Sequence, residues 1–214
     1  MANVNQINGF SPVGTVTGAA YNEQGRLYAI ASDASNTYAI GDAVALSTGC
    51  TTDGVPYVTK LTTSLTPLGV IVGIRVADPG TSLQGNSLSL EKSYIGLSAG
   101  IRYVYVVDDP NILMEVSSDS TGQAFSDVGS NCNPSITANQ TTLSMSAPYS
   151  SIVIDHTAVK ALGTSGSLAY LLQIVGVKRT PDNNGGATVS TAAPYLRMLV
   201  KWNHHAFVGA TGTA

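Results

Sequence analysis

The sequence predicts an all-β protein built as an antiparallel sandwich or barrel. Short runs of β-branched and aromatic residues recur along the chain, and clusters of Gly, Pro, Asn and Asp separate them. Helical periodicity is nearly absent, and no expected strand is followed by the long amphipathic helix that a parallel sheet requires. The chain has 214 residues, 43% of them hydrophobic, and is long enough to bury a substantial core.

The clearest expected strand is Ile101–Val107. Its segment Arg102-Tyr103-Val104-Tyr105-Val106-Val107 is rich in aromatic and β-branched residues. A strong turn signal, Pro181-Asp182-Asn183-Asn184-Gly185-Gly186, separates the last two strands. A short helical turn is expected at Gln123–Val128 and a weaker one at Val159–Leu162. In chain order the expected strands are Arg26–Ala31, Asp42–Leu46, Pro56–Lys60, Leu68–Val76, Ile101–Val107, Ile112–Val116, Ser151–Asp155, Tyr170–Lys178 and Leu196–Trp202.

The sequence indicates one β domain, residues 21–208, with no internal repeat and no linker. Residues 1–20 are polar, Gly-rich and weakly patterned, and we expect them to form an N-terminal arm. Residues 209–214 are expected to form a flexible C-terminal tail. Such arms are either frayed ends or segments that reach a neighbouring molecule, and the sequence leaves both readings open.

Charged residues are scarce, at 11% of the chain against roughly 25% in an ordinary soluble domain. A surface with so few charges is either covered by Ser, Thr, Asn and Gly or buried against partners. The net charge of −3 and the lack of a basic run argue against nucleic acid and membrane surfaces as partners. No apolar stretch is long enough to span a bilayer and no signal peptide is recognisable, so we expect a soluble protein made in the cytoplasm.

No group of residues predicts an active site, a metal or another cofactor. Asp108-Asp109-Pro110 is typical of a turn, and the adjacent His204 and His205 diverge in an extended segment. His156 follows Asp155 without a metal-binding spacing, and Gly163-Thr164-Ser165-Gly166-Ser167 is not a nucleophile elbow. Cys50 and Cys132 are expected to be free and buried, although a disulfide between them stays open. We therefore expect a protein that is not an enzyme.

Several stretches, taken in order, resemble the head decoration or cement proteins of tailed bacteriophages, and the resemblance covers nearly the whole chain. The residues that carry it are Gly9-Phe10-Ser11-Pro12-Val13, Arg26-Leu27-Tyr28-Ala29-Ile30, Gly41-Asp42-Ala43-Val44, Gly69-Val70-Ile71-Val72-Gly73, Tyr103-Val104-Tyr105-Val106-Val107-Asp108-Asp109-Pro110, Gly176-Val177, Pro181-Asp182-Asn183, Val200-Lys201-Trp202-Asn203-His204-His205 and the Gly-Thr-rich tail. The Ser/Thr-rich stretch from Asn139 to Ser150 departs from this pattern.

The resemblance implies a jelly-roll-like sandwich on the outer surface of a phage head, in the virion. Such a protein bridges subunits of the major capsid protein and associates with itself, as a dimer or a trimer. Aromatic residues in or near loops are candidates for these contacts because interface cores are poor in charge and rich in aromatics. The alternative is that the tyrosines cap the core. The candidate interface residues are Phe10, Tyr21, Tyr94, Tyr149, Tyr195 and Trp202.

Two other functions stay open. The first is another virion component, such as a neck, tail or head-fibre protein, which would share this composition. The second is a carbohydrate-binding β-sandwich, which needs a shallow aromatic platform. The single Trp and three Phe of the chain argue against such a platform.

Overall fold

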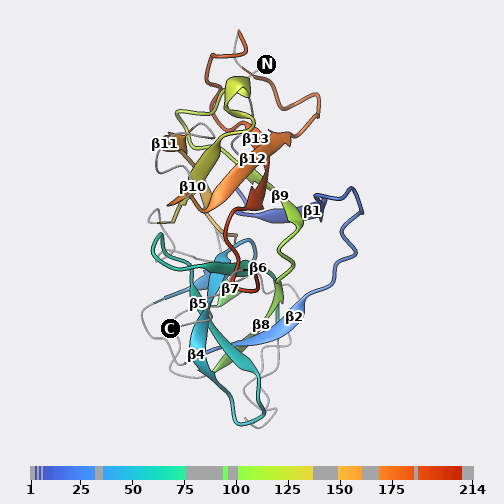
Figure 1. Ribbon diagram of the computed structural model, residues 1–214, viewed down its shortest axis with the longest axis vertical. Helices are drawn as coiled ribbons and strands as arrows, with labels where there is room; N and C mark the ends of the chain where they lie inside the picture. The colour runs from blue at the N-terminus through green and yellow to red at the C-terminus, as the bar shows by residue number, and fades with distance from the viewer. Residues whose placement is uncertain are drawn as a thin grey trace.

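The all-β prediction is confirmed by the computed structural model, in which two sheets pack against each other (Figure 1). The structure describes residues 3, 5, 7–31, 36–75, 94–95, 101–136, 149–160, 169–185 and 188–208. The short 3-10 helix η2 (Phe125–Asp127) lies inside the helical turn expected at Gln123–Val128. In the described residues no helix is long and apolar enough to cross a membrane.

The first unit is a closed five-stranded barrel with the strand order β2-β5-β4-β6-β8. Its strands β2 and β5 run parallel, and all other neighbours are antiparallel. Apolar side chains such as Tyr28, Val58 and Ile71 fill its interior. The strands are β2 (Arg26–Ile30), β4 (Ala43–Cys50), β5 (Pro56–Lys60), β6 (Pro67–Ile74) and β8 (Arg102–Val107), and the short strands β3 (Tyr38–Ala39) and β7 (Tyr94–Ile95) pair beside them.

The second unit is a six-stranded sheet with the order β1-β9-β13-β12-β10-β11. Ser118, directly after β9, forms a parallel bridge with Ile154 of β11, and the Asp119 N–H donates to the Ile154 carbonyl. These contacts close strands β9 to β13 into a ring, which we call the second barrel, and β1 lies on the outer edge of β9. The strands are β1 (Ser11–Thr15), β9 (Ile112–Ser117), β10 (Asn131–Ser135), β11 (Val153–Lys160), β12 (Leu172–Val177) and β13 (Arg197–Trp202).

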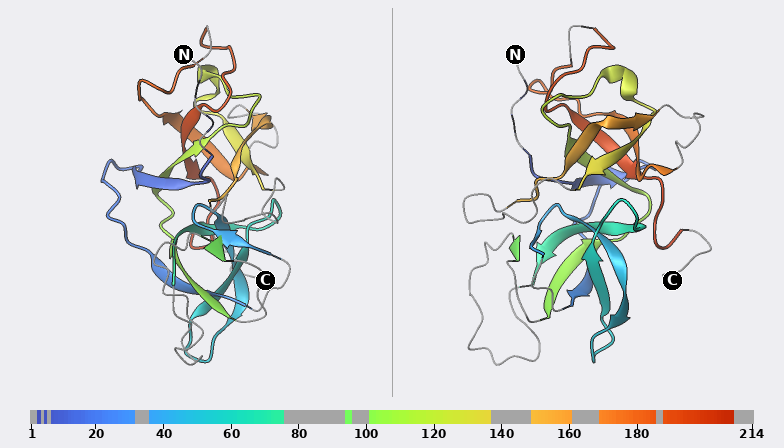
Figure 2. Two further views of the ribbon diagram at one scale, coloured as in Figure 1. Left: turned by 180° about the vertical axis from the view of Figure 1, so that it is seen from behind. Right: turned by 90° about the vertical axis from the view of Figure 1, so that its left-hand side faces the viewer.

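The two barrels have the same topology. In each, five strands in chain order occupy the spatial order first, third, second, fourth, fifth. Among the described residues, one parallel contact occurs in each barrel, and it joins the first strand or its end to the third. The strand connections therefore differ from those of a jelly roll, which threads its strands between two sheets. Here β2, β4, β5, β6 and β8 form one barrel and β9 to β13 the other (Figure 2).

The equivalence of the barrels extends to single residues. In β6, Val72 is the extra residue of a bulge between Ile71 and Gly73, which pair with Val106 and Tyr105 of β8.

In β12, Val175 is the extra residue of a bulge between Ile174 and Gly176, which pair with Val200 and Leu199 of β13. The segments around the two bulges read Ile-Val-Gly-Ile-Arg and Ile-Val-Gly-Val-Lys.

A glycine before the second strand of each barrel repeats in the same way. Gly41 and Gly129 both have a φ of 91°, a conformation that glycine adopts at little cost. The Gly41 N–H donates to the carbonyl of Ile71, and the Gly129 N–H donates to that of Ile174. The expectation that the chain lacks an internal repeat is therefore wrong.

The chain crosses between the barrels twice, and its two ends strengthen the junction. Residues 16–25 join β1 to β2, and Asp108–Asn111 join β8 to β9. Near the N-terminus, Phe10 packs against Trp202 and its N–H donates to the Gly41 carbonyl. Near the C-terminus, the Ala206 N–H donates to the Pro67 carbonyl of β6. One core cluster accordingly contains residues of both barrels.

This junction corrects the expected N-terminal arm, because Phe10 is buried and Ser11–Thr15 is a strand of the second sheet. The expected tail at 209–214 lies outside the described residues. The nine expected strands all correspond to observed ones, whereas β1, β3, β7 and β10 were not expected. The helical turn expected at Val159–Leu162 is wrong at Val159 and Lys160, which belong to β11, and its remainder lies outside the described residues.

Candidate functional site

Two of the six candidate interface residues are core residues of the junction between the barrels. Phe10 is 2% exposed and Trp202 is 4% exposed, and their ring centroids lie 5.4 Å apart. Neither ring is available to a partner. Aromatic side chains supply large apolar area to any buried contact, inside a chain or between chains, so the residue type does not distinguish the two cases.

The candidate tyrosines whose exposure the structure describes, Tyr21, Tyr149 and Tyr195, differ in it. Tyr149 is exposed, and Tyr21 is half-buried in a groove, where its hydroxyl donates to the Gln24 carbonyl. Tyr195 is half-buried with a φ of 55°, and its N–H donates to the Asp119 carbonyl. The backbone of Tyr94 pairs with Ala39 in the small β3-β7 sheet.

The turn that follows β8 has a structural role. The Asp109 carboxylate accepts the Asn111 N–H at 2.8 Å, which closes the turn expected at this position. Asp108 accepts a hydrogen bond from the Tyr28 hydroxyl at 2.6 Å and pairs with Arg26 at 3.0 Å. Burial and the hydrogen bond to Asp108 raise the pKa of Tyr28.

The C-terminal histidine pair also diverges as expected, with His204 exposed and His205 buried. The Phe207 N–H donates to Nδ1 of His205 at 3.1 Å, which leaves the ring proton on Nε2. Burial lowers the pKa of His205, although the Leu68 backbone and the charges of Asp108 and Asp109 oppose this shift.

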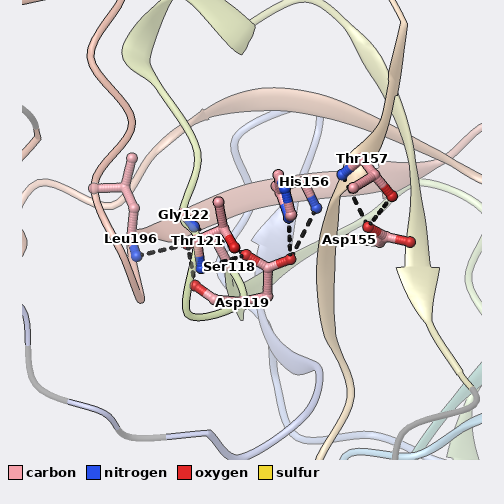
Figure 3. A network of polar contacts seen from close by, with 8 residues as sticks. All are labelled: Ser118, Asp119, Thr121, Gly122, Asp155, His156, Thr157 and Leu196. Carbon is pink, nitrogen blue, oxygen red and sulfur yellow. Dashed lines mark hydrogen bonds and ion pairs between the residues drawn. The ribbon is translucent and has the colours of Figure 1, made fainter.

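The densest group of ligand-type side chains in the described residues is Asp119, Asp155 and His156, whose polar atoms lie within 4.8 Å of one another (Figure 3). Sequence reasoning singled out His156 and missed Asp119, which is 37 residues away and is brought to β11 by the closure of the second barrel. Nothing in its sequence surroundings, Ser-Ser-Asp-Ser-Thr-Gly, distinguishes it from an ordinary turn.

Hydrogen bonds occupy both oxygens of the Asp119 carboxylate. Oδ2 accepts the His156 N–H at 3.1 Å and pairs with Nδ1 of the same residue at 2.6 Å, while Oδ1 accepts the N–H groups of Thr121 and Gly122. Burial alone raises the pKa of Asp119. The hydrogen bonds from the His156 side chain and from the backbone of Gly122 and His156 outweigh burial, and the net pKa lies below its ordinary value.

This arrangement resembles the carboxylate–imidazole half of a catalytic triad, but its surroundings favour a structural role. Ser118, the neighbouring hydroxyl, is fully buried, and its Oγ accepts the Leu196 N–H at 2.8 Å. The Asp155 carboxylate accepts both the N–H and the hydroxyl of Thr157. Because Asp119 already accepts four donors, we interpret the cluster as a latch that holds the irregular middle of β11 against the loop after β9.

The two cysteines are free, as expected, but only Cys132 is buried. Burial and the charge of Asp127 raise the pKa of the Cys132 thiol, which suits a core residue. Cys50 is exposed at the end of β4, so the expectation that both are buried is wrong for this residue.

Two grooves lie at equivalent positions on the two barrels. The groove of the second barrel has a volume of about 840 Å³ and a mainly apolar lining that includes the bulge Val175-Gly176, Leu199 and Val128. The groove of the first barrel, of about 880 Å³, includes the equivalent Val72, Gly73 and Tyr105, but residues 19–26 form its other wall and make it more polar.

Several of the few charged side chains pair with each other. Glu115 pairs with Lys178 at 2.9 Å and with Arg197 at 3.6 Å, and Arg197 also pairs with Asp182 at 2.6 Å. These ion pairs further reduce the number of unpaired charged side chains on the described surface. The surface is therefore mainly apolar and uncharged polar, with exposed side chains such as Tyr105, Phe125 and Val175.

Comparison with protein-family models and with curated proteins finds no match to this chain.

Proposed function

We propose that this protein is a structural component of a bacteriophage virion, a cement protein that binds the outer surface of the head and bridges subunits of the major capsid protein. The observation that carries the proposal is the pairing of two equivalent barrels in one chain, each with a groove at the same bulge. A molecule with two similar faces, joined through one core cluster, is suited to contact two neighbouring copies of a repeated partner.

Physical reasoning supports this choice. Two linked footprints bind more tightly than either alone, because the second contact forms at a high effective concentration. A protein that binds only the mature lattice stabilises it by mass action. The low charge fits as well, since charged side chains are depleted in the buried centres of interfaces. The ordered resemblance to cement proteins supplies the identity of the partner.

The test adds the purified, labelled protein to heads that lack it. We expect saturable binding in hundreds of copies and a higher temperature for release of the packaged DNA. Heads assembled with the protein present serve as the reference for full occupancy. A protein that never binds, or binds without raising head stability, would contradict the proposal.

The same experiment separates the alternatives. Binding in about a dozen copies at one vertex indicates a neck protein, as closed symmetric assembly predicts. Binding to a glycan array, with no binding to heads, indicates a carbohydrate-binding domain. A structural rather than enzymatic role is part of the proposal, and it predicts that head stabilisation needs no turnover of a substrate.

A further inference from the structure

The groove of the second barrel exposes an apolar surface that the described residues leave open. Phe125, Val128 and Val175 are 38%, 41% and 41% exposed and lie along this one groove. Large apolar side chains gathered in a groove, with polar residues at its rim, mark surfaces that bind other molecules. The exposed Arg179 gives this rim a positive charge, whereas the neighbouring Lys178 is paired with Glu115.

The equivalent face of the first barrel is partly covered by the chain itself, while its groove stays open beside Tyr105. Val72 and Ile40 occupy there the positions of Val175 and Val128, and a hollow beside them is lined by Phe10, Pro12 and Tyr21. These covering residues belong to the segment that precedes the first barrel.

The segment that precedes the second barrel, Asp108–Asn111, has four residues and is too short to do the same. The described part of the chain therefore supplies no matching cover for the open groove.

The first barrel offers the complementary surface near the start of β2. On the second barrel, β1 pairs with the first residues of β9. On the first barrel, β8 pairs with one side of β2 at Arg26, and on the other side, which β5 occupies from Ala29 onward, none of the described strands pairs with Arg26. Exposed Tyr105 lies on β8, opposite Leu27 and on the other side of β2 from this edge, where it lines the groove of the first barrel. The ring of exposed Phe207 lies 5.8 Å from the Arg26 guanidinium. The acidic residues Glu23 and Asp109 line the same groove.

We propose that a second copy of this chain docks head to tail, with the β2 edge of one copy seated on the open groove of the next. The contact would repeat between molecules the packing that joins the two barrels within one molecule. Apolar Tyr105 and Phe207 would meet Phe125 and Val175, and acidic Glu23 would face basic Arg179. A heterologous contact of this kind closes into a ring or extends into a row.

Self-association is measured on the purified full chain by sedimentation velocity from about 1 to 200 µM. Because this needs no capsid, failure of the inference and failure of the proposed virion role are distinguishable. We expect wild type to form oligomers and Val175→Glu to weaken them about tenfold or more. Val128→Glu provides a second substitution in the groove. Tyr149→Glu, exposed but outside both grooves, is the matched control and should associate like wild type.

A charge exchange tests the head-to-tail direction. Arg179→Glu should weaken association, Glu23→Arg should do so too, and the double variant should recover most of the loss. Unchanged urea midpoints confirm that each variant is folded. The proposal is overturned if wild type stays monomeric at all concentrations, if Val175→Glu and Val128→Glu associate normally, or if the double variant shows no recovery. A monomer whose Val175→Glu variant no longer binds heads would instead assign the groove to the capsid.

Discussion

Phe10→Ala tests whether the N-terminal segment holds the two barrels together. The side chain is 2% exposed, its ring centroid lies 5.4 Å from that of Trp202, and it belongs to the core cluster shared by both barrels. Loss of a fully buried Phe side chain removes about 2–3 kcal/mol of transfer free energy. The cavity left behind and the lost ring contact raise the total to about 4 kcal/mol.

The expected loss is large compared with a typical total stability of about 5–15 kcal/mol. Urea unfolding followed by tryptophan fluorescence measures it directly, because the single Trp of the chain, Trp202, is the residue that Phe10 contacts. At a slope of about 2 kcal/mol per molar urea, the midpoint should fall by about 2 M.

Val16→Ala is the control, since this exposed residue lies six positions along the same segment and should change stability by no more than about 0.5 kcal/mol. A loss below about 1 kcal/mol for Phe10→Ala would refute the reasoning. In that case the N-terminal segment would be an arm resting on the surface, as the sequence first indicated.

Three further predictions concern the latch, the repeated glycine and the buried histidine. Asp119→Asn should cost about 1–3 kcal/mol at pH 7, since the amide nitrogen cannot accept the His156 donors. Because folding lowers the pKa of Asp119, its contribution is present above about pH 4 and is lost as the pH falls through the folded pKa, so melting curves of wild type and variant should converge in acid. Gly41→Ala should lower the free energy of unfolding in urea more than Gly129→Ala does. Both glycines have a φ of 91°, but a Cβ at Gly41 would collide with a backbone carbonyl, whereas at Gly129 it meets no described atom. Equal losses for the two variants would contradict this. Since folding lowers the pKa of His205, stability should fall as the pH drops below about 6.5, and His205→Gln should remove that part of the pH dependence of the melting temperature.

The strands that sequence reasoning found are those whose composition suits a half-buried pleated surface. Val and Tyr dominate β8, and β13 alternates between buried and half-buried residues, so their residues predict both strands directly. Strand β10 has the sequence Asn-Cys-Asn-Pro-Ser, and its Pro134 lies past a break in register, beyond the residues that pair with β12. Only the closure of the barrel makes such a segment a strand, and that is a tertiary effect.

The repeat was missed for a related reason. A small barrel fixes which positions point inward but accepts almost any apolar residue there, so two barrels of one topology need share little sequence. Only the bulges, where the backbone is specific, keep the recognisable Ile-Val-Gly. The latch could not be found either, because Asp119 and His156 become neighbours only when β11 reaches the end of β9.

The repeat separates what the fold requires from what the function uses. Both barrels keep the bulge and the glycine of positive φ, so these features belong to the fold. The barrels differ at β1 and in the cover supplied by residues 10–25. They also differ in β11, which contains an insertion: Ile154 and Val159 are five residues apart in β11 but pair with residues only two apart in β10. Val58 and Lys60, by contrast, pair in β5 without such an insertion. The latch secures this insertion, and the missing cover leaves the groove beside Val175 open. The two faces are built alike. The face covered by residues 10–25 shows what kind of segment such a face binds, and a partner is therefore expected at the face that is left uncovered.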